Sequence, residues 1–148
     1  MLTGTLSGSR KITVADGAEI VLKDANITSL SNSAEYAGIT PFGDAAIFLE
    51  GTNTVKGGNE NYPGIYAPVN HTLTIGGDGS LDASSNGWAC GIGGGGNGQG
   101  AGCGDIFISA SANVTVDKGI EAPNDIGAGE EGTCGTVTIE DGANIIYK

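Results

Sequence analysis

The stretch Leu73-Thr-Ile-Gly-Gly-Asp-Gly-Ser-Leu-Asp-Ala83 contains a pattern that recurs throughout the chain. A short β-prone run is followed by an acidic glycine turn and then by a second β-prone run. Four further copies begin at Ile12, Ile47, Ile106 and Val137. The first residues of successive copies lie 35, 26, 33 and 31 positions apart. A period of this length indicates a repeat architecture.

A third short element precedes the paired runs in most repeats. Its copies are Tyr36-Ala-Gly-Ile39, Tyr62-Pro-Gly-Ile65, Trp88-Ala-Cys-Gly-Ile92 and Ala122-Pro-Asn-Asp-Ile126. Three β-runs per repeat, separated by Gly, Asn, Asp and Pro, are typical of a parallel β-helix. The sequence therefore predicts an all-β fold, a right-handed single-stranded parallel β-helix built as a three-faced solenoid of about five rungs.

Equivalent residues of such a fold should stack on one another at the strand spacing of about 4.8 Å. For the first run we predict inward-facing columns made of the pairs Ile12/Val14, Ile47/Leu49, Leu73/Ile75, Ile106/Ile108 and Val137/Ile139. We expect residues 1–148 to form one domain. Because repeats begin and stop close to both ends, we expect a segment excised from a longer secreted or surface protein, whose open end rungs could associate end to end.

Composition and charge exclude several classes of partner. Six basic residues against 17 acidic ones give a net charge of −11, which disfavours nucleic acid and anionic membranes. The longest apolar runs fall well short of the roughly 20 residues that span a bilayer, so membrane insertion is not expected. An acidic surface remains compatible with divalent cations and neutral polymers.

Three cysteines, Cys90, Cys103 and Cys134, allow at most one intramolecular disulfide. The phrases that begin at Cys103 and Cys134 align, which predicts that these two residues are neighbours on adjacent rungs, within disulfide range. A Cys90–Cys103 bridge or a reduced stack remains open. The glycine run between Cys90 and Cys103 lacks the following helix and the lysine of a phosphate-binding loop, so we interpret it as a compact surface loop.

Acidic residues recur at the turns, and this pattern predicts a calcium site. We select Asp125, Glu130 and Glu131 in the last glycine-rich loop, and Asp78 at a turn between two β-runs. Calcium takes six to eight oxygen ligands from such carboxylates and from loop carbonyls. The alternative is that Asp-Gly and Glu-Gly simply form solvated turns.

Aromatic residues at equivalent repeat positions predict a ligand-binding surface. Tyr36, Tyr62 and Trp88 begin three consecutive copies of the third element, and Tyr66 lies close by in sequence. Aromatic rings stack on the C–H faces of sugars, so this column could bind a polysaccharide or glycan. The alternative is that these rings cover the edge of the core.

Catalysis is not expected. A lyase of β-helical fold needs a basic residue beside calcium-binding acids, whereas this chain has six basic residues and none in an obvious acidic cluster. A hydrolase would need carboxylates close together on one face, whereas the acids here fall mainly at turns.

Several phrases resemble a known family. Ile20-Val-Leu-Lys-Asp-Ala-Asn-Ile-Thr28, Ala45–Val55 and Leu73–Leu81 are similar to a bacterial extracellular family of β-helical carbohydrate-binding domains, related in fold to pectate lyases but without lytic activity. Cys90-Gly-Ile-Gly-Gly-Gly and Cys103-Gly-Asp-Ile-Phe-Ile108 look like repeats of gut-bacterial surface proteins. The resemblance covers most of the chain, but its motifs are structural, and the family's calcium sites do not map onto particular residues.

The resemblance implies a non-catalytic glycan-binding module on the bacterial cell surface or outside the cell. The alternative is a structural or adhesive segment that acts as a stiff spacer.

Overall fold

The computed structural model describes residues 1–28, 31–98 and 100–148, and these residues form β-strands, turns and loops. The strands are β1 (Leu2–Thr5), β2 (Ile12–Val14), β3 (Ala18–Ile27), β4 (Ile39–Pro41), β5 (Ala45–Glu50), β6 (Thr52–Lys56), β7 (Ile65–Tyr66), β8 (Thr72–Gly77), β9 (Ser80–Ser84), β10 (Ile92–Gly93), β11 (Asp105–Ile108), β12 (Asn113–Asp117), β13 (Ile126–Gly127), β14 (Val137–Ile139) and β15 (Asn144–Tyr147). The all-β prediction is confirmed.

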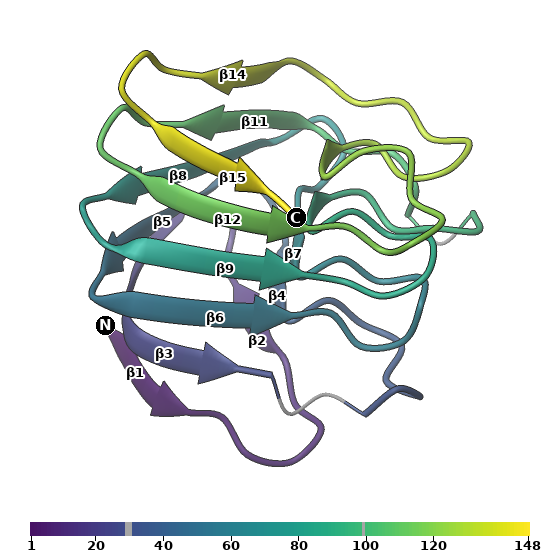
Figure 1. Ribbon diagram of the computed structural model, residues 1–148, viewed down its shortest axis with the longest axis horizontal. Helices are drawn as coiled ribbons and strands as arrows, with labels where there is room; N and C mark the ends of the chain where they lie inside the picture. The colour runs from purple at the N-terminus through teal and green to yellow at the C-terminus, as the bar shows by residue number, and fades with distance from the viewer. Residues whose placement is uncertain (29–30, 99) are drawn as a thin grey trace.

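Two parallel sheets contain all of these strands. The larger has ten strands: nine follow the order β14-β11-β8-β5-β3-β6-β9-β12-β15, and β1 pairs with β3 outside this path. The smaller has five strands in the order β13-β10-β7-β4-β2. Figure 1 shows β6, β9, β12 and β15 stacked in front of β5, β8, β11 and β14. The large sheet thus bends at β3 into a half-barrel.

The predicted single-stranded, three-faced β-helix solenoid is wrong in its sheet structure. Two of the expected faces are one continuous sheet, because Ala18–Lys23 of β3 pair with β5 while Asn26 and Ile27 pair with β6. The ten residues of β3 contain no Gly or Pro, so nothing in its sequence breaks the strand. Only Asp24 leaves the extended conformation, with φ of 50°.

The predicted columns were right in the second half of the chain and wrong in the first. Leu73 and Ile75 pair with Ile106 and Ile108, which pair in turn with Val137 and Ile139, as predicted, although Val137 and Ile139 are exposed at the end of the column. The column of Ile39, Ile65, Ile92 and Ile126 also forms, in the smaller sheet.

The first-half error has two parts. Ile12 lies in the smaller sheet and pairs with Ile39, whereas Ile47 pairs with Ile20. On its other side Ile47 pairs with Ile75 and not with Leu73, a shift of two residues that keeps the same side chains facing the core.

Aliphatic side chains from both sheets form one core. Its largest fully buried members are Leu22, Ile27, Ile39, Ile47, Leu49, Ile65, Leu73, Ile75, Leu81, Ile92, Ile106 and Ile108. Each such side chain contributes about 2 kcal/mol relative to an exposed one. Alternation along the strands places their neighbours outside, as in β9 and β12, where every second residue is buried.

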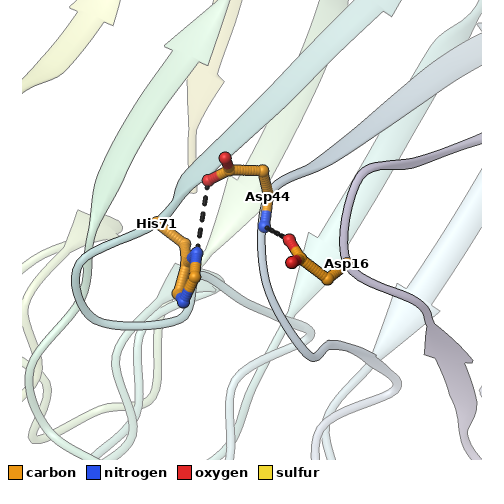
Figure 2. A group of neighbouring side chains, drawn as sticks. All are labelled: Asp16, Asp44 and His71. Atoms are coloured by element: carbon orange, nitrogen blue, oxygen red, sulfur yellow. Dashed lines mark hydrogen bonds and ion pairs between the residues drawn. The ribbon is translucent and has the colours of Figure 1, made fainter.

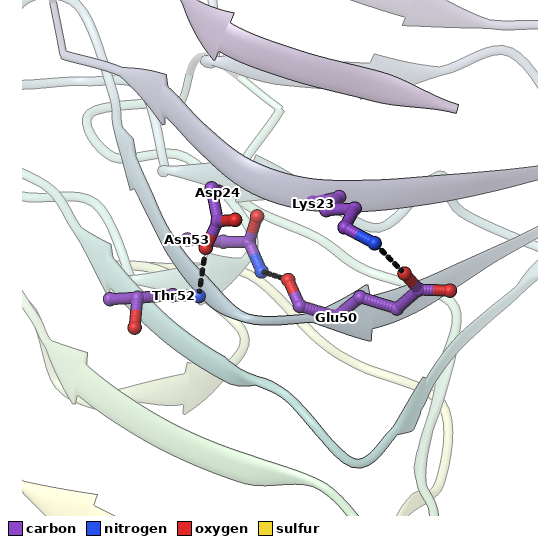
Figure 3. A network of polar contacts seen from close by, with 5 residues as sticks. All are labelled: Lys23, Asp24, Glu50, Thr52 and Asn53. Carbon is purple, nitrogen blue, oxygen red and sulfur yellow. Dashed lines mark hydrogen bonds and ion pairs between the residues drawn. The ribbon is translucent and has the colours of Figure 1, made fainter.

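Polar side chains link neighbouring strands where the large sheet bends (Figure 3). The Asp24 carboxylate accepts a hydrogen bond from the backbone N–H of Thr52 at 3.0 Å, and the Lys23 Nζ lies 3.0 Å from the Glu50 carboxylate. The Glu50 carboxylate raises the pKa of Lys23, chiefly through this hydrogen bond. Both side chains are about half exposed, so the pair contributes little to stability.

The outermost strands of the large sheet leave apolar side chains in water. Val137 and Ile139 of β14 and Ile146 and Tyr147 of β15 are all exposed. The described part of the chain contains no helix that is long and apolar enough to cross a bilayer.

Candidate tyrosine pocket

Three of the four predicted ligand-binding residues line one pocket of about 220 Å³. We call it the tyrosine pocket. It is lined by Lys11, Glu35, Tyr36, Ala37, Thr40, Tyr62, Pro63, Tyr66 and Gly100.

The pairing of two short strands aligns the tyrosines. Tyr36 precedes Ile39 of β4 by three residues, Tyr62 precedes Ile65 of β7 by three residues, and Ile39 pairs with Ile65. Ile65 is fully buried, so the alternation of the strand turns Tyr66 outward. All three tyrosines are half-buried and line the pocket.

Contacts hold the Tyr36 ring in place. Its hydroxyl donates a hydrogen bond to the Ser9 carbonyl oxygen at 2.7 Å, and the Lys11 Nζ lies 5.3 Å from the ring centroid. This is the distance of a cation–π contact. The ring is thus fixed at its hydroxyl end, and the positively charged Lys11 ammonium lies over one of its faces.

The remaining polar groups of the tyrosine pocket are available to a ligand. Within residues 1–28, 31–98 and 100–148, the side chains of Glu35, Tyr62 and Tyr66 form no hydrogen bond or ion pair with other protein groups. Thr40 Oγ1 is buried in the wall and also lacks a partner among the described residues.

Trp88, the fourth predicted residue, does not line the tyrosine pocket. Its backbone N–H donates to the Glu60 carbonyl oxygen at 2.7 Å, and its Cβ lies so close to Gly96 that a methyl group on Gly96 would stand 2.1 Å away. The glycine-rich loop therefore packs against Trp88.

Sequence reasoning missed Lys11, Glu35 and Gly100 as pocket residues. Glu35 could have been found as the neighbour of Tyr36. Lys11 gave no signal, because its contact with Tyr36 depends on the unexpected pairing of β2 with β4. Gly100 has φ of +63°, and a side chain there would lie 3.5 Å from the Tyr66 ring, so its lack of one keeps the pocket open.

The four residues predicted to bind calcium do not form a cluster of three or more candidate ligands in the described residues. Asp78 is exposed in the turn between β8 and β9, and Glu131 is exposed in the last glycine-rich loop, where Glu130 is half-buried. Asp125 is half-buried, with one carboxylate oxygen that has no partner among the described residues. Calcium binding by these residues stays a prediction.

A different group of possible metal ligands comes together at the start of β5 and β8. Candidate ligand atoms of Asp16, Asp44 and His71 lie within 4.8 Å of one another (Figure 2). Asp16 accepts a hydrogen bond from the backbone N–H of Asp44 at 2.9 Å, Asp44 accepts one from Thr72 at 2.8 Å, and His71 Nδ1 lies 3.4 Å from Asp44.

The same contact recurs elsewhere, with Asp105 accepting from the N–H of Thr136 at 2.7 Å. Each of these acceptors bonds to a backbone group 28 or 31 residues further on, in the neighbouring strand or turn. These hydrogen bonds give the turn carboxylates a structural role that needs no metal.

The cysteines divide into a bridged pair and a buried thiol. Cys103 and Cys134 are β-bridge partners joined by a disulfide, which confirms that they are neighbours and excludes the Cys90–Cys103 alternative. Cys90 is free and fully buried. Burial raises the pKa of its thiol to about 12, so the thiol is protonated at neutral pH and is a poor nucleophile.

Comparisons with protein-family models, with curated proteins and with solved structures found no match for this chain. The geometry and chemistry of the tyrosine pocket are therefore the evidence for function.

Proposed function

We propose that this protein is a non-catalytic glycan-binding module that holds a sugar in the tyrosine pocket. The observation that carries the proposal is the convergence of Tyr36, Tyr62 and Tyr66 on one half-open hollow. Binding sites for small molecules are typically concave and largely aromatic, with a few polar groups that fix orientation. Lys11 and Glu35 supply such groups here.

The lining of the pocket supports binding rather than hydrolysis. In the described residues it includes a single carboxylate, Glu35, whereas most glycoside hydrolases use a pair of carboxylates about 5–10 Å apart. The buried, protonated thiol of Cys90 offers no nucleophile in its place.

An extracellular or cell-surface location accords with the Cys103–Cys134 disulfide. Structural disulfides persist in oxidising compartments and are rare in the cytosol. The net charge of −11 favours a neutral polymer as partner over a polyanionic one.

A structural or adhesive segment is the second candidate. The exposed apolar side chains of β14 and β15 favour it, because the free edge of a sheet can pair with another strand. In that role the tyrosines would only cover the edge of the core, and they would not bind a glycan.

Affinity electrophoresis in gels that contain soluble polysaccharides separates the two candidates. The glycan-binding proposal predicts that at least one neutral or pectin-like polymer retards the wild-type protein, and that Tyr62→Ala abolishes the retardation. Tyr147→Ala is the matched control, since Tyr147 lies in β15, outside the pocket. If no polymer retards the wild type, or if Tyr62→Ala is retarded like Tyr147→Ala while both keep their thermal melts, the proposal is wrong.

A further inference from the structure

We infer that the tyrosine pocket takes one neutral pyranose ring, in preference to a uronate or a cationic ligand. This inference rests on the proposed function and names the class of sugar. It follows from the size of the pocket and from the two opposite charges that line it.

The volume of the pocket limits the ligand to a single ring. Pockets that enclose drug-sized molecules measure roughly 300–1,000 Å³. The tyrosine pocket, at about 220 Å³, lies below that range. One sugar unit therefore enters it, and any further units of a chain lie outside, on the surface of the protein.

Two charges of opposite sign disfavour both classes of ionic ligand. A uronate would meet the attraction of Lys11 but also the repulsion of Glu35, inside a protein of net charge −11. A cationic ligand would meet the attraction of Glu35 but also the repulsion of Lys11. The Lys11 ammonium also lies over the Tyr36 ring already, where such a ligand would bind. A charge in the binding site lowers the affinity for a wrong ligand that has a charge of the same sign.

A neutral sugar can use both charges at once. Its hydroxyl groups both donate and accept, so one can accept from the Lys11 ammonium while another donates to the Glu35 carboxylate. Hydrogen bonds to charged groups are about twice as strong as neutral ones. The Tyr62 and Tyr66 hydroxyls, which have no partner among the described residues, complete the polar set.

Isothermal titration with single sugars tests the inference. The ligands are methyl glucoside, methyl galactoside and methyl mannoside, the methyl glycosides of glucuronic and galacturonic acid, and tetramethylammonium as the cation. We expect saturable binding of at least one neutral glycoside, at least about tenfold tighter than its uronate. Tetramethylammonium should give no saturable heat.

Two variants identify the source of the discrimination. Glu35→Gln removes the repelling charge and should bring the uronate to within about threefold of the neutral glycoside. Asp141→Asn, which removes an equal charge at an exposed turn outside the pocket, should leave the preference of the wild type intact.

The outcomes separate this inference from the proposed function. A uronate or tetramethylammonium that binds as tightly as the neutral glycosides overturns the inference, and a bound uronate leaves glycan binding standing. Equal effects of Glu35→Gln and Asp141→Asn would also overturn it, because the discrimination would then reflect net charge. If none of the sugars binds and no polysaccharide retards the protein, the proposed function itself is wrong.

Discussion

The buried side chain of Asn53 accepts a hydrogen bond from the backbone N–H of Ala25 at 3.0 Å, across 28 residues of sequence. Its amide nitrogen donates to the carbonyl oxygens of Glu50 at 3.0 Å and Ser80 at 3.1 Å. Asn53 is fully buried, at 0% exposure, and its neighbours along the core column are aliphatic. One amide therefore joins β3, the end of β5, and β9 where the large sheet bends.

Replacing Asn53 should destabilise the protein strongly. Asn53→Ala leaves the buried Ala25 N–H without its partner and removes the hydrogen bonds to the Glu50 and Ser80 carbonyl oxygens, at a cost of about 3 kcal/mol in the free energy of unfolding. Urea denaturation followed by tyrosine and tryptophan fluorescence measures this change. The control is Asn144→Ala at an exposed position in β15, which should stay within about 0.5 kcal/mol of the wild type. Equal effects of the two substitutions would mean that the Asn53 contacts contribute nothing.

Reduction of the disulfide should weaken the fold without abolishing it. The Cys103–Cys134 bridge closes a loop across 31 positions, and a loop of that size corresponds to about 4 kcal/mol of stabilisation. We expect the urea midpoint to fall in dithiothreitol, and the double variant Cys103→Ala/Cys134→Ala to match the reduced protein. A midpoint that reductant leaves unchanged, with both thiols shown free by mass spectrometry, would contradict this.

The buried thiol of Cys90 should make stability depend on alkaline pH. Burial raises the pKa of Cys90 in the folded protein from its ordinary 9.0 to about 12, so the unfolded state loses this proton first. Between pH 9 and pH 12 the unfolded state therefore binds fewer protons, and the free energy of unfolding falls by up to about 1.4 kcal/mol per pH unit from this group. Below pH 9 the contribution is complete and constant.

Denaturation of the wild type and of Cys90→Ala at pH 8, 9.5 and 11 isolates the contribution of Cys90, since other groups titrate in both proteins. The wild type should lose stability more steeply than the variant. If the free energy of unfolding falls equally with pH in both proteins, the Cys90 thiol ionises as readily in the folded state as in the unfolded state.

The turn carboxylates should act mainly as acceptors for backbone groups. Asp44 is 64% exposed and accepts from the N–H of Thr72, so Asp44→Ala should cost about 1 kcal/mol. Asp44→Asn keeps an oxygen in place and should stay close to the wild type. Thermal melting with and without calcium distinguishes this role from metal binding. A rise in melting temperature with calcium that both substitutions remove would instead place a cation at Asp16, Asp44 and His71.

Much of the strand pattern could be predicted from sequence, because stacked strands need like residues at like positions. The isoleucines at positions 39, 65, 92 and 126 end equivalent repeat phrases, and they pair with one another in the smaller sheet. The bend of the large sheet could not be predicted. It depends on Asp24, whose carboxylate bonds to Thr52, and no local motif marks a ten-residue strand that serves two partners.

The aromatic part of the tyrosine pocket was predictable because Tyr36 and Tyr62 occupy equivalent repeat positions. Its charged part was not, because Lys11 reaches Tyr36 only through the pairing of β2 with β4, and the repeat pattern assigned β2 to a different column. Trp88 was wrongly predicted to line the pocket for the opposite reason. It follows the repeat, but the glycine-rich loop packs over it.

A sugar that binds in the tyrosine pocket would contact its tyrosine rings. The chain has four tyrosines, of which Tyr36, Tyr62 and Tyr66 line the pocket while Tyr147 does not. The most direct measurement is an NMR titration of protein labelled with ¹³C at the tyrosine rings, using the methyl pyranoside that binds best. We predict that the ring signals of the three pocket tyrosines shift saturably while that of Tyr147 stays still. Four unchanged signals at high sugar concentration, or a shift at Tyr147 alone, would show that no sugar binds in the tyrosine pocket.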